Sequence, residues 1–157
     1  MKKLIFLLLL FISTMGHSGA MEFTLENNKF IVKNGDVQSY YFHMNIDGYN
    51  VNCGGDRVLL WGHPIKIEND NPQASGFVLL NIIKKSIIKS INFSKGIYEV
   101  DFLTNRNAYI GSGLGYTIDI DTGVISNLDT NIDLDDTSVY EKCIEKNKSW
   151  SYNRYAK

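Results

Sequence analysis

Positive charge is scarce in this chain and nowhere concentrated. Sixteen lysines and arginines stand against 17 aspartates and glutamates in 157 residues, which gives a formal net charge of −1. Beyond Lys2-Lys3, the basic residues form no dense cluster. Because proteins bind the phosphate backbone of nucleic acids through basic patches, we expect no nucleic-acid partner.

Long apolar runs are also lacking. The run from Leu4 to Ile12 follows Lys2-Lys3 and precedes the small residues Ser18-Gly19-Ala20. It is too short for an ordinary membrane-spanning helix, which needs about 20 residues, and the pattern is typical of a secretory signal peptide. No cysteine that could carry a lipid adjoins the expected cleavage site.

We therefore expect residues 1–20 to be removed. The mature chain, residues 21–157, would be a single domain in the periplasm or outside the cell, without a membrane anchor. Loss of Lys2 and Lys3 would leave 14 basic and 17 acidic residues, a net charge of −3.

Only two cysteines are present, Cys53 and Cys143, and both lie in the part expected to be exported. Two cysteines in an oxidising compartment normally form a disulfide. This bond would close a loop of about 90 residues and stabilise the fold by roughly 4 kcal/mol in a chain-entropy model. The alternative is a catalytic thiolate, but no histidine adjoins either cysteine. We predict the disulfide.

Recognisable catalytic motifs are missing. His43 and His63 are the only histidines after residue 20, and their neighbours Met44 and Pro64 suggest a strand end and a turn. No third metal ligand can be named beside them, and no nucleophile-elbow motif occurs. We therefore predict that the protein is not an enzyme and that it has no catalytic residues, no metal and no cofactor.

What the chain does contain is a β meander from Gly96 to Leu128. The segments Tyr98 to Phe102 and Tyr116 to Ile120 alternate with period two, as half-buried strands do. A glycine-rich turn, Gly111 to Gly115, lies between them. The triplet Asp121-Thr122-Gly123 supplies a hairpin turn, because glycine adopts positive φ at little cost.

Strand patterns also fill most of the remaining chain. Arg57 to Trp61 is continuously apolar after its first residue, which predicts a strand covered on both faces. Phe77 to Ile83 and Ser86 to Ile91 are rich in β-branched residues, so we favour two strands with a turn at Lys84-Lys85 over one helix. We expect further turns at Asp47-Gly48 and Gly62-His63-Pro64, a strand at Ile65 to Glu68, and an exposed loop from Asn69 to Gly76.

One short helix is expected near the C-terminus, from Thr137 to Lys146. Ser138 and Glu141 have capping-box spacing there. The predicted fold is mainly β, with antiparallel meanders packed as a sandwich or a partly open barrel.

The stretch Ala108 to Gly123 resembles one repeat of the quinone-dehydrogenase-like β-propellers. The shared features are a small-apolar strand, Gly111-Ser112, a glycine before the aromatic Tyr116, an alternating strand, and Asp-x-x-Thr-Gly at its end. The tryptophan that commonly closes such repeats is replaced by Val124-Ile125. Propellers of at least four blades need at least about 160 residues. The resemblance therefore implies blade-like sheets in a sandwich or open barrel, or an assembly of several chains.

The outline of the chain also resembles the periplasmic immunity proteins that bacteria pair with toxins. It combines an expected signal peptide, a small acidic β domain and one disulfide. This resemblance implies a protein that neutralises a toxin or hydrolase by direct binding. The alternatives are a secreted hydrolase or carbohydrate-binding protein with its site at Gly111 to Gly115, and an accessory subunit of an envelope complex.

Two polar segments are candidate contacts with such a partner, because both are expected to be exposed. The residues are Asp70, Asn71, Asp129, Asp133, Asp135 and Asp136. The run from Asp129 to Asp135 alternates like the first half of a calcium loop, but Leu134 and Tyr140 stand where an EF-hand needs Gly and Glu. We interpret it as the acidic edge of a strand.

Two other features have structural and functional interpretations. Gly111 to Gly115 lacks the lysine and the following helix of a phosphate loop, so a tight turn is favoured. Aromatic residues gather in the first half of the mature chain. Such residues are usually core, although some can anchor an interface. They are Tyr40, Tyr41, Phe42, Tyr49 and Trp61.

Overall fold

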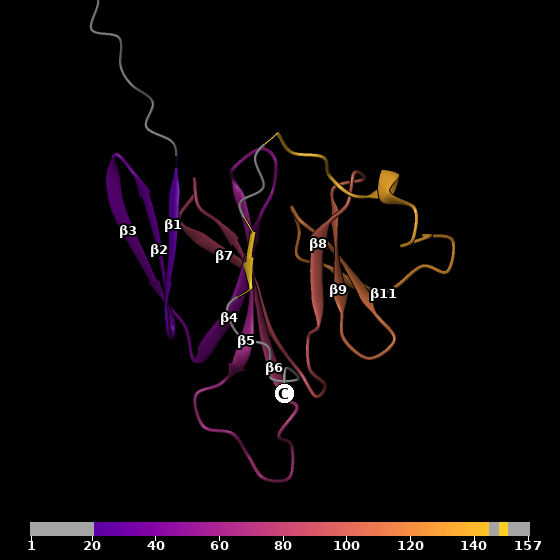
Figure 1. The fold of residues 1–157 in the computed structure, drawn as a ribbon, viewed down its shortest axis with the longest axis horizontal. Helices are drawn as coiled ribbons and strands as arrows, with labels where there is room; N and C mark the ends of the chain where they lie inside the picture. The colour runs from indigo at the N-terminus through magenta and orange to yellow at the C-terminus, as the bar shows by residue number, and fades with distance from the viewer. Residues whose placement is uncertain (1–20, 145–147, 151–157) are drawn as a thin grey trace, which may run out of the picture.

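The computed structural model describes residues 21–144 and 148–150. The expected signal peptide and the end of the chain, residues 151–157, lie outside the described residues. Within the described part, three antiparallel sheets stand side by side (Figure 1). The mainly β fold predicted from the sequence is confirmed, and none of these sheets closes into a barrel.

The N-terminal sheet has three strands, and its order follows the chain. They are β1 (Glu22–Glu26), β2 (Lys29–Asn34) and β3 (Asp36–Tyr41). Both turns contain residues that favour turns. Asn27 has φ of 52° in the first turn and Gly35 has φ of 71° in the second. Short asparagine and glycine turns therefore set the register of this sheet.

The central sheet has five strands in the order β12, β4, β5, β6, β7. Their bounds are β4 (Met44–Val51), β5 (Arg57–Pro64), β6 (Ser75–Asn81), β7 (Ser86–Phe93) and β12 (Lys148–Trp150). The two strands predicted on either side of Lys84-Lys85 are confirmed as β6 and β7. Lys85 takes φ of 53° in the turn between them.

In the middle of the central sheet, strands β5 and β6 are buried on both faces. Leu59, Trp61 and Leu79 face the C-terminal sheet and belong to one apolar core. Val58 and Leu60 face the N-terminal sheet and belong to a second core, which includes Phe30. A strand with both faces covered needs apolar residues at every position, which explains the continuous apolar run that begins at Val58.

The C-terminal sheet has four strands in the order β11, β10, β9, β8. Their bounds are β8 (Glu99–Phe102), β9 (Asn107–Gly111), β10 (Tyr116–Asp119) and β11 (Ile125–Asn127). The predicted meander is confirmed. Gly123 has φ of 72° in the β10–β11 turn. The side chain of Asp119 holds that turn by accepting hydrogen bonds from the backbone N–H groups of Asp121 and Thr122.

Two predicted breaks in the central sheet are wrong. Asp47-Gly48 is not a turn but a bulge inside β4, where the pairing with β5 shifts between Ile46 and Gly48. A Cβ at Gly48 would lie 2.5 Å from a ring carbon of Trp61. Glycine is needed at this position because the indole packs against the backbone, not because the chain reverses.

The second wrong break is Gly62-His63-Pro64, since β5 continues through all three residues. A Cβ at Gly62 would lie 1.8 Å from the backbone oxygen of Asn45 on the neighbouring strand. The glycine again permits close packing of two strands. Pro64 ends the strand instead of preventing it.

The strand predicted at Ile65 to Glu68 is also wrong. Residues 65–74 form a loop that extends from the lower end of the central sheet in Figure 1. Ile65 and Ile67 are 57% and 52% exposed in it, so their alternation covers no core. The predicted loop ends earlier than expected, since Ser75 and Gly76 are buried at the start of β6.

The predicted C-terminal helix is reduced to a single 3₁₀ turn, η1 (Thr137–Val139). Asp136 caps it by accepting a hydrogen bond from the N–H of Ser138. The predicted capping box does not form, because the carboxylate of Glu141 instead accepts the N–H of Cys53 at 2.8 Å. Residues 145–147, where the predicted helix would end, lie outside the described residues.

The segment after β11 crosses the outer face of the C-terminal sheet, and we call residues 128–143 the strap (Figure 1). Its ends are fixed by backbone hydrogen bonds: the N–H of Leu128 donates to Gly115, and the N–H of Glu141 donates to Phe102. The predicted Cys53–Cys143 disulfide is confirmed, with Cα atoms 5.0 Å apart. It ties the end of the strap to the β4–β5 turn.

Candidate functional site

A groove of about 500 Å³ opens beside the disulfide. Three walls meet there. The edge of the C-terminal sheet contributes β8, the edge of the central sheet contributes β4 and β12, and the strap contributes its C-terminal half. The lining residues that carry charge are Glu99, Asp101, Glu141, Lys142 and Lys148. Its volume lies within the range of small-molecule sites.

One carboxylate oxygen of Asp101 is held by two side chains of the central sheet. Its Oδ1 atom accepts a hydrogen bond from Nζ of Lys148 at 2.6 Å and another from Nδ2 of Asn50 at 3.1 Å. The amide of Asn50 also donates to the backbone oxygen of Val100. These contacts join β4 and β12 to the edge strand β8, so Asp101 has a structural role in forming the wall.

Glu99 lies two residues before Asp101 on the same face of β8. Among the described residues, no side-chain hydrogen bond or ion pair holds its carboxylate. Its pKa is raised above the ordinary range, first because the group is partly desolvated and second because the charge of Asp101 repels a second negative charge. Lys148 opposes this shift without cancelling it. The groove therefore contains a carboxylate that no described residue binds directly.

Two tyrosines, one in β9 and one in the strap, also have raised pKa values. Burial raises the pKa of Tyr109, and a hydrogen bond with Tyr98 raises it further. Burial also raises the pKa of Tyr140, with the charge of Glu99 as the next cause. The hydroxyl of Tyr140 donates to the backbone oxygen of Leu134 at 3.0 Å. With raised pKa values, both tyrosine side chains stay neutral near pH 7.

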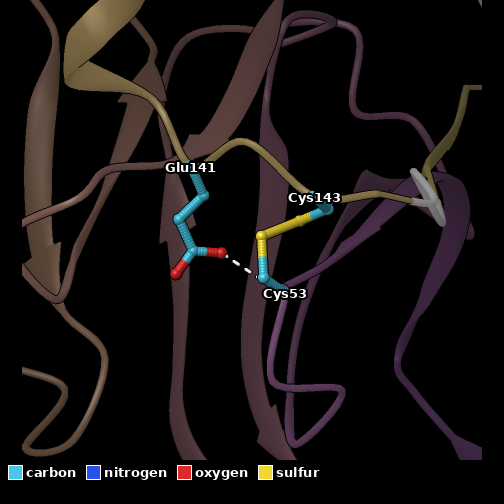
Figure 2. Close-up of side chains that lie close together, drawn as sticks. All are labelled: Cys53, Glu141 and Cys143. Carbon is cyan, nitrogen blue, oxygen red and sulfur yellow. Dashed lines mark hydrogen bonds between the residues drawn. A yellow bond between two sulfur atoms is a disulfide. The ribbon is translucent and has the colours of Figure 1, made fainter.

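Cys53, Glu141 and Cys143 lie together at the end of the groove, and their possible ligand atoms lie within 4.8 Å of one another (Figure 2). Zinc and similar metals bind the thiolate form of cysteine. Here both sulfur atoms are used in the disulfide, and Glu141 accepts a backbone hydrogen bond. This arrangement is a structural junction, and it does not offer a metal the ligands it needs.

The structure places the four acidic strap residues on the surface, where Asp129, Asp133, Asp135 and Asp136 are all exposed. Their interpretation as a strand edge is wrong, because this part of the strap contains no strand. Asp129 accepts the N–H of Asn131, and Asp133 accepts the N–H of Asp135. The alternation reflects successive turns in which an aspartate bonds to the backbone two residues on.

Asp70 and Asn71 do not join the strap residues. They lie on the 65–74 loop, which follows β5, at the opposite end of that strand from the β4–β5 turn (Figure 1). Asp70 is exposed and Asn71 is half-buried. The six residues predicted to contact a partner therefore form two separate surfaces, and one small interface would not include both.

The glycine-rich turn borders a second groove, of about 760 Å³, between β7 and the C-terminal sheet. Gly113 and Gly115 take φ of 61° and 88°, so the glycines serve the tight turn that the sequence predicts. Leu114 at its tip is 97% exposed. A strand, β10, follows the turn, which therefore has no helix N-terminus to hold a phosphate.

The predicted position of His43 at a strand end is confirmed, whereas His63 lies in a strand and not in the predicted turn. His43 is exposed in the bend between β3 and β4, and His63 lies near the end of β5. Nδ1 of His63 lies 2.6 Å from Oδ1 of Asp47, and Nε2 lies 3.3 Å from the amide nitrogen of Asn45. The pair joins the bulge in β4 to the neighbouring strand.

The aromatic residues singled out in the sequence divide between core and surface. Trp61 and Phe42 are buried, and Tyr40 and Tyr49 pack against the second core. Tyr41 is 67% exposed on the edge strand β3. Most of them are therefore core residues, and one is on the surface.

Sequence reasoning did not identify the groove residues Glu99, Asp101 and Lys148. The signal was partly visible, because the alternation of β8 places both carboxylates opposite the core residues Val100 and Phe102. The strap and β12, which complete the groove, are distant in sequence. No local pattern reveals that they meet.

Comparison with protein-family models, curated proteins and solved structures finds no match to this chain. Within residues 21–144 and 148–150, no helix combines the length and apolar character that a membrane-spanning segment requires.

Proposed function

We propose that this is an exported binding protein that neutralises a toxin or hydrolase by direct contact. The observation that carries the proposal is the acidic strap, which is exposed and at the same time internally ordered. Four aspartates project from it, and its C-terminal end is fixed by the disulfide. An ordered acidic surface is suited to a basic partner.

The order of the strap lowers the entropic penalty of binding. A flexible acidic loop would lose rotamer and backbone freedom at the interface, which costs roughly 0.5–1.5 kcal/mol per immobilised side chain. Asp129, Asp133 and Asp136 already accept hydrogen bonds within their own turns. Their positions are set before a partner arrives.

Charge on such a surface acts mainly on the rate of association. Long-range attraction between an acidic strap and a basic partner speeds encounter and is weakened by salt. The 65–74 loop is separate from this surface, so we assign the first contact to the strap alone.

The test is co-expression with the product of an adjacent toxin-like reading frame, followed by affinity capture and a survival assay. We expect a complex and protection. Replacing Asp133, Asp135 and Asp136 by Asn should slow association and flatten its salt dependence. Asparagine keeps the oxygen that accepts the turn hydrogen bonds, so the fold should be unchanged.

A matched control removes equal charge from the N-terminal sheet: Glu22→Gln, Glu26→Gln and Asp36→Asn. Association should be almost unaffected in this variant. Equal slowing in both variants would contradict a role for the strap, and the absence of both complex and protection would contradict the function itself.

The groove beside the glycine-rich turn favours a second candidate, a small-ligand or carbohydrate-binding protein. Phe93 and Tyr116 lie in its wall with ring centroids 5.1 Å apart, and Asn92 and Asn127 add polar groups. A glycan array followed by Tyr116→Ala on any positive spot tests this candidate. No saturable glycan binding would contradict it.

A further inference from the structure

The carboxylates that line the groove beside the disulfide differ in the partners that they have. Asp101 is satisfied by Lys148 and Asn50, and Glu141 accepts the N–H of Cys53. Lys142 lies close enough to Asp136 to lower the pKa of that carboxyl. Among the described residues, Glu99 is the lining carboxylate that accepts neither a hydrogen bond nor an ion pair.

We infer that this groove binds an ammonium or guanidinium group carried on an alkyl chain, with Glu99 as its counter-ion. The half-buried position of Glu99 makes an ion pair there stronger than one on the open surface, because water screens it less. Tyr140 lines the same groove. The groove has room for the group together with its alkyl stem.

The lining fits both parts of such a ligand. Val51, Phe102 and Leu134 provide apolar surface for an alkyl stem, while Glu99 provides the charge. Long basic side chains bind in this way, with the stem on apolar surface and the head on a polar group. Lys148 does not occupy the site, because its Nζ atom is held at 2.6 Å by Asp101.

Two sources can supply this chemistry. One is a lysine or arginine side chain of a protein partner, in which case the inference rests on the proposed function and adds an anchor residue to it. The other is a free organic cation such as a polyamine. A groove about 500 Å³ in volume accepts either.

The test uses three soluble probes and NMR of the full mature protein with ¹³C-labelled glutamate. The probes are n-butylguanidinium, a blocked Gly-Arg-Gly peptide and spermidine. We expect a saturable shift of the Glu99 side-chain carboxyl resonance with at least one probe. Glu99→Gln should weaken binding by about tenfold, as loss of a hydrogen bond to a charged group does.

A matched variant, Asp129→Asn, removes a carboxylate from the strap outside the groove. It should change probe binding by less than about twofold, since exposed charges contribute little to binding. Tighter binding of the arginine peptide than of spermidine would identify a protein side chain as the source. The reverse order would identify a free polyamine.

A second measurement does not need a variant. Acidification should release the probe as Glu99 takes up a proton, because a neutral carboxyl no longer attracts a cation. The titratable groups around Glu99 that must be followed in the same titration are Tyr98, Asp101, Tyr109, Tyr140, Glu141, Lys142 and Lys148.

No saturable shift with any probe would overturn the inference, as would equal probe binding by wild type and a folded Glu99→Gln variant. Neither result would bear on protection against a toxin, which the survival assay measures separately. Protection without probe binding would retain the strap as an interface and remove the groove from it.

Discussion

The two outer sheets pack against the same central sheet, but their outward faces are covered to different extents. The N-terminal sheet exposes its outer face to solvent. Glu22 pairs there with Lys33 at 3.0 Å, and Nζ of Lys29 lies 5.8 Å from the ring centroid of Tyr41. The C-terminal sheet covers its outer face with the strap, under which Tyr109 is only 4% exposed.

The difference shows two ways to end a stack of sheets. Charged residues make an outer face compatible with water and discourage further stacking. A covering segment instead buries the outer face and can form a site at its margin. In this protein the groove with Glu99 exists because the strap covers one sheet, whereas no described segment covers the other sheet.

Removing the disulfide should reduce the difference between the covered and the open outer face more than any other change. We expect Cys53→Ser with Cys143→Ser to lower the free energy of unfolding by about 4 kcal/mol, since the bond closes a long loop. Urea unfolding measures the loss. Limited proteolysis should cut the double variant within residues 128–143 and leave β1 to β3 intact.

The single variant Cys53→Ser is the control, and it should behave like the double variant. A loss below about 1 kcal/mol, or first cleavage in the N-terminal sheet, would show that the strap is held by its other contacts. That result would show that the position of the strap does not depend on the disulfide.

Two tyrosines allow the covered and the open outer face to be compared directly. Tyr109 is on the covered outer face and Tyr41 is on the open one, 4% and 67% exposed. Tyr109→Ala should lower the free energy of unfolding by about 3 kcal/mol, as truncation of a buried aromatic side chain does. Tyr41→Ala should change it by less than about 0.5 kcal/mol. Similar losses in denaturant titrations would contradict the assignment of one covered and one open face.

Acid should destabilise the C-terminal sheet at its β10–β11 turn, and this effect should be smaller than that of the two preceding changes. The pKa of Asp119 is lowered first by a hydrogen bond from the N–H of Thr122, and that of Asp121 first by a hydrogen bond from Arg106. A carboxyl with a lowered folded pKa stabilises the fold above its unfolded pKa, about 3.9. That contribution is lost as the pH falls through the folded pKa.

We therefore expect amide protection in β10 and β11 to decrease below about pH 4, after correction for intrinsic exchange. Asp119→Asn keeps the acceptor oxygen for the turn and should reduce this dependence. Glu99 has the opposite sign, because its raised pKa favours the folded state as the pH falls. An unchanged acid response in Asp119→Asn would assign the effect to other groups.

Much of the fold could be predicted from local patterns. The hairpin at Asp121-Thr122-Gly123 and the strands β6 and β7 follow from turn chemistry and β-branched residues, and the structure confirms them. The errors have a common cause. Gly48 and Gly62 suggest turns, but they are required by the close approach of Trp61 and of the neighbouring backbone. The structural role of a glycine cannot be deduced until the residues that pack against it are known.

The candidate site was less predictable than the fold. The exposure of Asp129 and Asp133 was correctly expected, but their turn conformation was not, since aspartates at alternate positions suit a strand edge and successive turns equally well. The position of Glu99 in a groove depends on β12 and the strap. Both reach it from residues that are distant in the sequence.

The sequence by itself determined the β character, most turns and the pairing of Cys53 with Cys143. Alternation and turn propensity act over a few residues, and two cysteines permit only one intramolecular bond. The tertiary structure decided which faces are covered, where the strap lies and that Glu99 has no ion-pair partner among the residues that the structure describes. Those properties arise from packing between distant segments, because burial and electrostatic environment belong to a position in space and not to a residue type.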